Sequence, residues 1–203
     1  MGAYSTAAKN REQKIFRAIN SVCRQQTKHK IELIGIIDSC EISKKVLKKN
    51  YDQIDNPDIC SFYNLEYKKD KNFNACKARN AGIDKATGDI ICYLDIDDYF
   101  MMDHVEKIVS NFTGLWIYFD AWNFNPKKNE WYRSVPNIHQ QFQNGTWNFA
   151  HSINSVARWK VPAYGWDDWA FLCELKYESE GKYIGEGSYR ICHWPGAPYK
   201  YDV

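Results

Sequence analysis

The sequence predicts an α/β fold built around a mostly parallel sheet flanked by helices. Short apolar runs rich in β-branched residues alternate with segments of helical periodicity, as they do in βαβ units. Two of these runs lead into aspartates, at 31–38 and 89–98. The chain has 203 residues, enough to bury a hydrophobic core without disulfides or metal ions. We therefore expect one domain over residues 1–203.

The first elements follow one another in the order that a parallel sheet requires. Apolar residues recur at helical spacing from Arg11 to Gln26, which predicts a helix. The run 31–37 reads I-E-L-I-G-I-I and ends at Asp38, so it predicts a strand buried on both faces. A lysine-rich helix is expected around 42–49, and alanine-rich residues 74–86 predict the next helix.

The middle of the chain continues this alternation. Residues 89–94 (D-I-I-C-Y-L) predict a second buried strand, which runs into the acidic sequence D-I-D-D at 95–98. A helix is expected over 103–112 and a strand over 114–122. In open α/β sheets, ligands bind at the carboxyl ends of the strands. The acidic cluster is therefore predicted to lie at a binding crevice.

The pattern weakens beyond residue 122. Residues 123–163 are rich in Asn, Gln, Trp and Pro and lack clear periodicity, which predicts loops and short antiparallel strands. Residues 167–177 predict the last helix, and 181–203 show no clear pattern. The segment 123–163 is a plausible wall of a binding site.

Composition excludes several classes of protein. The net charge of +2 and the charged fraction of 26% argue against a polybasic nucleic-acid binder. No apolar run reaches the roughly 18 residues of a transmembrane helix, and the first residues lack the apolar stretch of a secretion signal. The seven cysteines include no C-x-x-C pair, which favours reduced thiols. We expect a cytoplasmic protein with no nucleic-acid partner; the oligomeric state stays open.

The D-I-D-D segment is the first candidate for chemistry. Asp95 and Asp97 are two residues apart, so in extended backbone both side chains lie on the same side. Two such carboxylates form a hard oxygen site for Mg²⁺ or Mn²⁺. An acidic loop that caps a helix is the alternative, because D-x-D is a frequent tripeptide.

Other candidates come from separate segments. Asp38 ends a buried strand and could accept hydrogen bonds from a base or ribose, or serve only in a turn. Arg79 could donate to a base or diphosphate, or lie exposed on its helix. Asp167 and Asp168 fit the first turn of a helix, and their tryptophan neighbours also suggest a carboxylate beside a sugar platform. His193 is either a metal ligand or a structural histidine.

Three segments resemble the inverting family 2 glycosyltransferases of GT-A fold, and they occur in the family's order. They are residues 5–38, the run A-R-N-A-G-I-D-K-A-T-G-D-I-I-C-Y-L-D-I-D-D at 78–98, and G-W-D-D-W at 165–169. The resemblance implies a GT-A (Rossmann-like) fold and a hexosyltransferase-type enzyme. Such an enzyme moves a sugar from a nucleotide-diphosphate donor to a hydroxyl of a glycan or other acceptor. The chain is short for the family, so we expect a near-minimal catalytic core. The resemblance implies a nucleotide-sugar-binding half at 1–122 and an acceptor-side half at 123–203, within one domain.

The resemblance also implies roles for single residues in donor binding. Thr6 and Asp38 would contact the nucleotide base, and Arg79 would hold the base or the diphosphate. Asp95 and Asp98 would serve the ribose, the donor sugar or a metal. The donor expected from the family is a UDP-sugar.

Metal binding and catalysis are assigned in the same way. Asp97 would be the main ligand of Mn²⁺ or Mg²⁺, and His193 would complete the metal site. Asp168 would be the catalytic base, with Asp167 as the alternative. Trp166, Trp147 and His151 are expected on the acceptor side; that list rests on their residue types alone.

Two other functions remain possible on the sequence. A nucleotidyltransferase uses a related α/β core, but it is expected to carry a glycine-rich phosphate loop, which Thr6-Ala7-Ala8-Lys9 lacks. A non-catalytic carbohydrate-binding module would explain the 16% of aromatic residues, yet it leaves the acidic cluster without a role.

Overall fold

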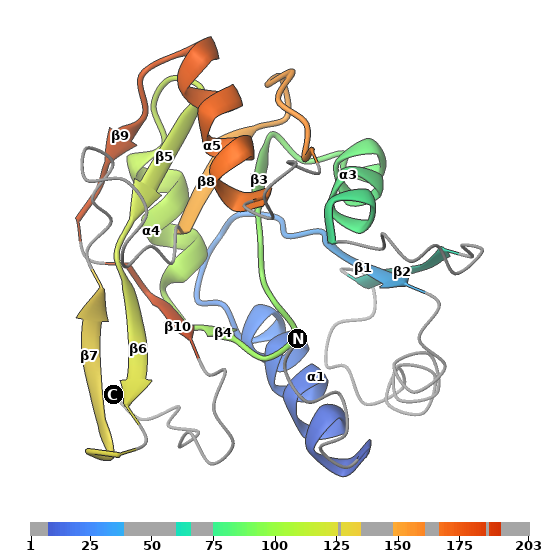
Figure 1. Cartoon of the computed structure of the whole chain (residues 1–203), viewed down its shortest axis with the longest axis vertical. Coiled ribbons are helices and arrows are strands. Elements are labelled where there is room, and N and C mark those ends of the chain that lie inside the picture. Colours follow the sequence, from blue (N-terminus) through green and yellow to red (C-terminus); the bar gives the residue numbers. More distant parts are fainter. Residues whose placement is uncertain are drawn as a thin grey trace.

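The computed structural model combines helices with β-sheets, which confirms the predicted α/β class (Figure 1). It describes residues 8–38, 60–65, 75–125, 127–134, 148–160, 167–185 and 187–191. The helices in these ranges are α1 (Ala8–Cys23), α3 (Ala75–Lys85), α4 (His104–Asn111) and α5 (Asp167–Glu178). The strands are β1 (Leu33–Asp38), β2 (Cys60–Leu65), β3 (Ile90–Cys92), β4 (Tyr99–Phe100), β5 (Trp116–Phe119), β6 (Ala121–Asn125), β7 (Glu130–Ser134), β8 (Asn148–Ser152), β9 (Lys182–Tyr183) and β10 (Tyr189–Ile191).

The described strands form three sheets, with the orders β1-β2, β3-β8-β5-β9 and β4-β10-β6-β7. Parallel pairing joins β1 to β2, β5 to β9 and β6 to β10, whereas the remaining pairs are antiparallel. The sheets are therefore mixed rather than mostly parallel. The main reason is β8, which comes from the segment without clear periodicity and lies between β3 and β5, antiparallel to both.

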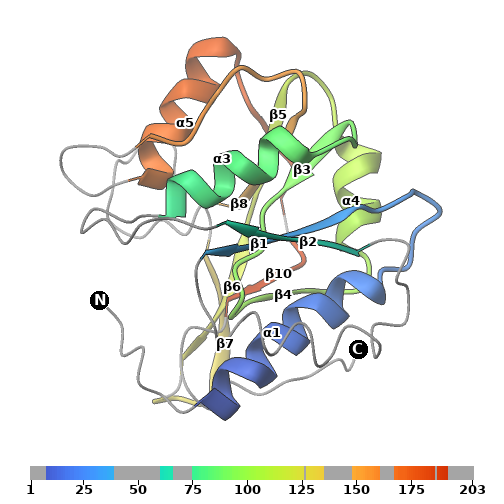
Figure 2. The same cartoon turned by 90° about the vertical axis from the view of Figure 1, so that its right-hand side faces the viewer.

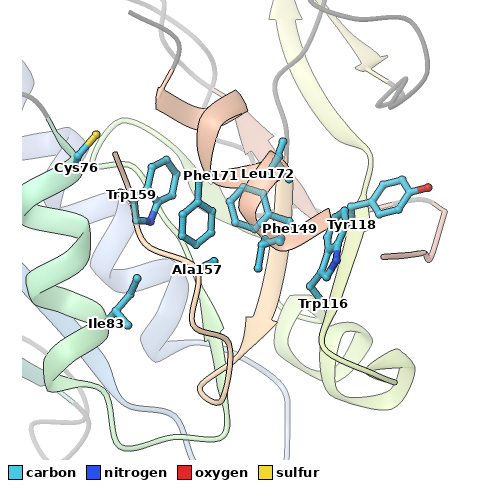
Figure 3. Packing of buried hydrophobic residues seen from close by; sticks show 10 residues of the cluster. Cys76, Ile83, Trp116, Tyr118, Phe149, Ala157, Trp159, Phe171 and Leu172 are labelled. Atoms are coloured by element: carbon cyan, nitrogen blue, oxygen red, sulfur yellow. The ribbon is translucent and has the colours of Figure 1, made fainter. Parts of the chain in front are cut away.

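The strand β5 separates two hydrophobic cores. Its side chains alternate between the two faces of the sheet, as the two-residue period of a strand requires. Trp116 and Tyr118 pack into the core beneath α5, together with Phe171 (Figure 3). Ile117 and Phe119 pack on the opposite face, in the core that includes Ile108 of α4. The two helices thereby cover opposite faces of the same sheet.

The pair β1–β2 lies between α3 and α1 (Figure 2). On one side, Ile15 of α1 packs in a small cluster with Ile37 of β1. On the other side, α3 packs on β1, and a methyl group at Gly82 would make an ordinary contact with the Ile36 side chain at 3.6 Å. This packing places the carboxyl end of β1 near the start of α3.

Several elements agree with the sequence predictions, and others differ. The helices expected at 11–26, 74–86, 103–112 and 167–177 correspond to α1, α3, α4 and α5. The strand expected over 114–122 is two strands, because the chain changes sheets at Asp120. The strands β2, β9 and β10 were not predicted. The lysine-rich helix expected at 42–49 lies outside the described residues. None of the described helices has the combined length and hydropathy of a membrane-spanning helix.

Candidate active site

A cavity of about 190 Å³ opens at the carboxyl end of β3. Its lining includes Arg79 from α3, Asp95 from the loop after β3, and Asp168 from α5. The half-exposed side chains of Asp95 and Asp168 mark its mouth. All three residues come from segments that are far apart in the sequence, and each is a predicted site residue. The structure therefore brings part of the predicted constellation together at one crevice.

Arg79 joins the two carboxylates at the mouth of the cavity. Its guanidinium lies 3.4 Å from Asp95 Oδ1 and 3.3 Å from Asp168 Oδ1. The two aspartate side chains are about half exposed, at 52% and 56%, while the arginine side chain is only 20% exposed. Two carboxylates that converge repel each other, and the arginine charge between them offsets this repulsion.

The arginine rests on an aromatic platform. Its guanidinium carbon lies 4.2 Å from the centre of the Trp159 ring, within the range of a cation–π interaction. The other face of the platform is supported by α5, because Trp159 stacks on Phe171 with 4.4 Å between ring centres and an interplanar angle of 8°. Asn80 anchors the platform to α3: its amide donates to the Trp159 carbonyl, and its amide oxygen accepts from the Trp159 backbone N–H.

A buried chain of hydrogen bonds supports this platform from below. The Trp159 indole donates to Tyr93 Oη at 3.1 Å, and Tyr93 Oη lies 2.8 Å from His151 Nε2. His151 Nδ1 lies 2.9 Å from the Ser152 carbonyl, which can only accept, so Nδ1 carries the proton. Nε2 therefore accepts from Tyr93. Burial lowers the pKa of His151 and raises the pKa of Tyr93, so both stay neutral.

This geometry corrects one expectation for the acceptor side. His151 is completely buried and does not line the cavity, so it has no surface to offer an acceptor. His151 lies on β8 and packs in the core beneath α5, where its ring contacts that of Phe171.

The loop D-I-D-D is fixed by Tyr189 of β10. The Tyr189 hydroxyl donates to Asp98 Oδ2 at 3.0 Å and accepts from the backbone N–H of Asp95 at 3.3 Å. Burial, reinforced by the charge of Asp98, raises the pKa of Tyr189, so the hydroxyl keeps the proton that it donates. Asp98 is only 2% exposed and lines the cavity. A turn with a hydrogen bond from the Asp98 N–H to the Asp95 carbonyl completes the loop.

Asp97 lies differently from its two neighbours. Its carboxylate is 3.6 Å from Lys14 Nζ of α1, and it is not among the residues that line the cavity. Its backbone carbonyl accepts a hydrogen bond from Arg17. Within the described ranges, no three His, Cys, Asp or Glu side chains gather in a group that could hold a metal ion. The assignment of Asp97 as the main metal ligand stays a prediction, because His193, its expected partner, lies outside the described residues.

The remaining predicted residues cannot be compared with the structure in full. Thr6, Trp147, Trp166 and His193 lie outside the described residues. Asp38 ends β1 and Asp167 begins α5, but only their backbones are described. The choice between Asp167 and Asp168 as the base therefore still rests on sequence.

Sequence reasoning missed Trp159, Tyr93 and Tyr189. The sequence around Trp159 does not indicate a role at a functional site, because a single tryptophan in an irregular segment is a common core residue. Tyr93 stands inside a predicted strand, and Tyr189 falls in the tail that shows no clear pattern. The one available signal was the position of Tyr93, two residues before Asp95 at a predicted strand end.

Comparisons with known proteins agree with this arrangement. The family model described as Glycosyl transferase family 2 matches residues 6–162. A solved structure of S. aureus TarS, residues 1–349, superposes with a TM-score of 0.62 at 15% sequence identity. The match covers 90% of this chain and 58% of the TarS structure, so the chain spans less than two thirds of that neighbour. A search of curated proteins found no significant match.

Proposed function

The chain belongs to glycosyl transferase family 2, and we propose that it moves a sugar from a nucleotide-diphosphate donor to a hydroxyl group of an acceptor. The observation that carries this proposal is the cavity mouth, where Arg79 holds the carboxylates of Asp95 and Asp168 together. A carboxylate that lines a cavity can accept a proton from a hydroxyl bound there, and the ion pair with Arg79 holds the Asp168 carboxylate in place.

The proposed reaction is a single displacement. Asp168 accepts the proton of the acceptor hydroxyl, and the oxygen forms a bond to the anomeric carbon of the donor sugar. The bond from that carbon to the diphosphate breaks, and its electron pair leaves with the diphosphate, through an oxocarbenium-like state. Attack opposite to the leaving group inverts the anomeric configuration. Arg79 keeps Asp168 oriented toward the cavity while this occurs.

A divalent cation, Mn²⁺ or Mg²⁺, is part of the proposal. The donor set has suitable chemistry, because the D-I-D-D loop offers three carboxylates and such cations prefer oxygen ligands. We propose Asp97 and His193 as ligands, with Asp97 exchanging its contact with Lys14 for the cation. A bound cation supplies positive charge that stabilises the departing diphosphate.

Asp97→Asn tests the metal assignment by itself. In the wild type, nucleotide binding measured by calorimetry should strengthen when Mn²⁺ is added and weaken again with EDTA. The variant should bind the nucleotide with the same affinity in both conditions. Metal-dependent binding that survives in Asp97→Asn would remove this ligand from the proposal.

The donor and acceptor are proposed from the family. We propose a UDP-sugar as donor and a glycan or other hydroxyl compound as acceptor. Asp38 and Thr6 would contact the base, and Trp147 and Trp166 would contact the acceptor.

A thermal-shift panel tests the proposed function most broadly. Purified protein is heated with UDP-, GDP- and dTDP-sugars and with the free sugars, each with and without Mn²⁺. A ligand at 100 times its dissociation constant adds about 2.7 kcal/mol of stability, which shifts the melting temperature by several degrees. We expect stabilisation by at least one nucleotide sugar, and a larger shift with Mn²⁺.

The same panel separates the alternatives. Stabilisation by free sugars alone, independent of nucleotide and metal, would indicate a carbohydrate-binding module. Stabilisation by nucleoside triphosphates and sugar phosphates instead of nucleotide sugars would indicate a nucleotidyltransferase. No shift with any nucleotide sugar would contradict the proposed transferase.

A further inference from the structure

Two residues that line the cavity each carry a buried side-chain nitrogen without a hydrogen-bond partner in the described part of the chain. These nitrogens are Nε2 of His104 and Nδ2 of Asn148. The two residues are 1% and 8% exposed, and both line the cavity whose mouth holds Arg79 and Asp168. Because both residues are far less exposed than Asp95 and Asp168, we take their part of the lining as the inner end of the cavity. Buried polar groups are nearly always hydrogen-bonded, so these two nitrogens have hydrogen-bonding capacity that a ligand in the cavity can use.

The surroundings of these nitrogens suit an uncharged group. The His104 ring stacks on Phe100 at 3.9 Å between centres, and its Nδ1 lies 3.0 Å from Ser188 Oγ. Burial lowers the pKa of His104 to about 3, so the ring is neutral near pH 7. Phe119 and Ile191, both buried, add apolar walls. A phosphate placed there would lose its hydration without gaining an opposite charge.

The cavity has the size of a small ligand. A water molecule occupies about 30 Å³, and sites for drug-sized ligands span about 300–1,000 Å³. The cavity, at about 190 Å³, lies between these values. It is large enough for more than one water and smaller than a typical site for a drug-sized ligand. A single sugar ring is the part of a nucleotide sugar that fits this range.

Orientation follows from the position of the proposed base. The anomeric carbon has to lie near the mouth, where an acceptor hydroxyl can reach both that carbon and Asp168. The rest of the sugar ring then extends inward. The substituents far from the anomeric carbon meet the inner end of the cavity.

We propose that His104 and Asn148 bind an uncharged oxygen substituent of the transferred sugar and thereby help to select it. This inference rests on the proposed function, because it assumes that the cavity holds a donor sugar. The Asn148 amide donates a hydrogen bond to the oxygen. A hydroxyl at this place also donates to His104 Nε2 when that nitrogen lacks a proton.

Asn148→Leu tests the proposal, because leucine has a similar volume and no hydrogen-bonding atoms. Calorimetry measures the affinity of the wild type and the variant for the best UDP-sugar and for UDP alone. We expect the affinity for the UDP-sugar to fall about 5- to 10-fold and the affinity for UDP to stay unchanged. The melting temperature without ligand should not fall, since the Asn148 amide nitrogen has no partner to lose.

Ser179→Ala is the matched control. Its hydroxyl is also buried without a partner, but it does not line the cavity. This variant should bind both ligands like the wild type. A second experiment changes the ligand instead of the protein. The affinity of the wild type is measured for analogues of the UDP-sugar that each lack one ring hydroxyl. At least one analogue should bind about 5- to 10-fold more weakly than the parent UDP-sugar.

The outcomes separate the inference from the proposed function. Equal UDP-sugar affinity in the wild type and Asn148→Leu, with no deoxy-sugar effect, would mean that only water fills the inner end. Equal losses for UDP and the UDP-sugar, with a lower melting temperature, would mean that Asn148 is structural. If the wild type binds no nucleotide sugar at all, the proposed function fails together with this inference.

Discussion

Arg79 contacts all three parts of the cavity mouth: Asp95, Asp168 and the Trp159 platform. The guanidinium is planar and offers donors in two directions, so it can join two carboxylates while its face stays on the indole. A lysine or a metal ion would not stack in this way. The residue therefore links α3, the D-I-D-D loop and α5 at one point.

Arg79→Met should separate activity from stability. Its ion pairs are partly exposed, so the loss should lower the free energy of unfolding by only about 1 kcal/mol or less. Turnover should fall about 10²-fold, because the two carboxylates lose their common orientation. Urea unfolding and a transfer assay measure the two quantities.

Lys160→Met is the control for Arg79→Met. Lys160 forms a 2.7 Å ion pair with Glu174 on the surface, outside the cavity lining. The Lys160→Met variant should leave turnover unchanged. Similar losses of turnover in both variants would remove the special role of Arg79.

Single residues were the part of the site that the sequence predicted best. Arg79, Asp95, Asp98 and Asp168 were all expected at the crevice, since each sits in a recognisable family segment. The expected placement of the Asp95 and Asp97 side chains on one side was wrong: Asp95 contacts Arg79 and Asp97 contacts Lys14. The two-residue spacing rule assumes extended backbone, whereas the loop turns between Asp95 and Asp98. Contacts such as that of Tyr189 with Asp98 depend on tertiary packing, which no local pattern records.

The buried His104 predicts a pH effect on stability. Its pKa is about 3 in the folded protein and about 6.5 in an unfolded chain. Below pH 6.5, His104 binds a proton in the unfolded state but not in the folded state. The free energy of unfolding should therefore fall as the pH drops from 6.5 toward 3, by up to about 1.4 kcal/mol per pH unit.

Comparison with His104→Phe tests this effect. The phenylalanine keeps the stacking on Phe100 but cannot bind a proton. Urea unfolding between pH 7.5 and 4.5 should give a shallower slope for the variant than for the wild type. His151 acts in the same direction in both proteins, so it does not change the difference. Equal slopes would contradict a neutral buried His104.

At the scale of elements, β10 positions much of the site. It contributes Tyr189, which fixes the D-I-D-D loop, and it follows Ser188, which contacts His104. Just before this strand, the backbone of Gly187 packs closely against Asp120 and Phe119. A side chain there would overlap the backbone carbonyl oxygen of Asp120 and come within 2.7 Å of the Phe119 ring.

Gly187→Ala should therefore shift β10. We expect a loss of about 1–3 kcal/mol in the free energy of unfolding, and weaker donor binding because Tyr189 moves with the strand. Gly88→Ala is the control, since a methyl group at that position meets nothing within 4 Å. Denaturant unfolding measures both variants. A Gly187→Ala protein as stable as Gly88→Ala would show that β10 tolerates displacement.

Elements were predictable where their local pattern was strong. The amphipathic periodicity of α1 and the continuous apolar run around β5 identified both elements. The short strands β4, β9 and β10 have only two or three residues, too few for a period to appear. The order of strands in the sheets could not be predicted from local sequence patterns either, because β8 pairs with β3 and β5, which are distant in the sequence.

At the scale of the whole molecule, three distant segments meet at one cavity. Arg79, Asp95 and Asp168 come from α3, the loop after β3, and α5, and the chain must fold completely to bring them together. The family membership and the α/β fold follow from the comparisons and the topology. We propose that glycosyl transfer takes place at this cavity, with Asp168 as the base.

The most direct test of that claim is turnover by Asp168→Asn, measured beside donor affinity. Asparagine keeps the size of the side chain but does not act as a base, so turnover should fall about 10²- to 10⁴-fold while the donor binds normally. Asp84→Asn is the control, because Asp84 is an exposed aspartate outside the cavity lining and should keep full activity. Full turnover in Asp168→Asn would contradict the account.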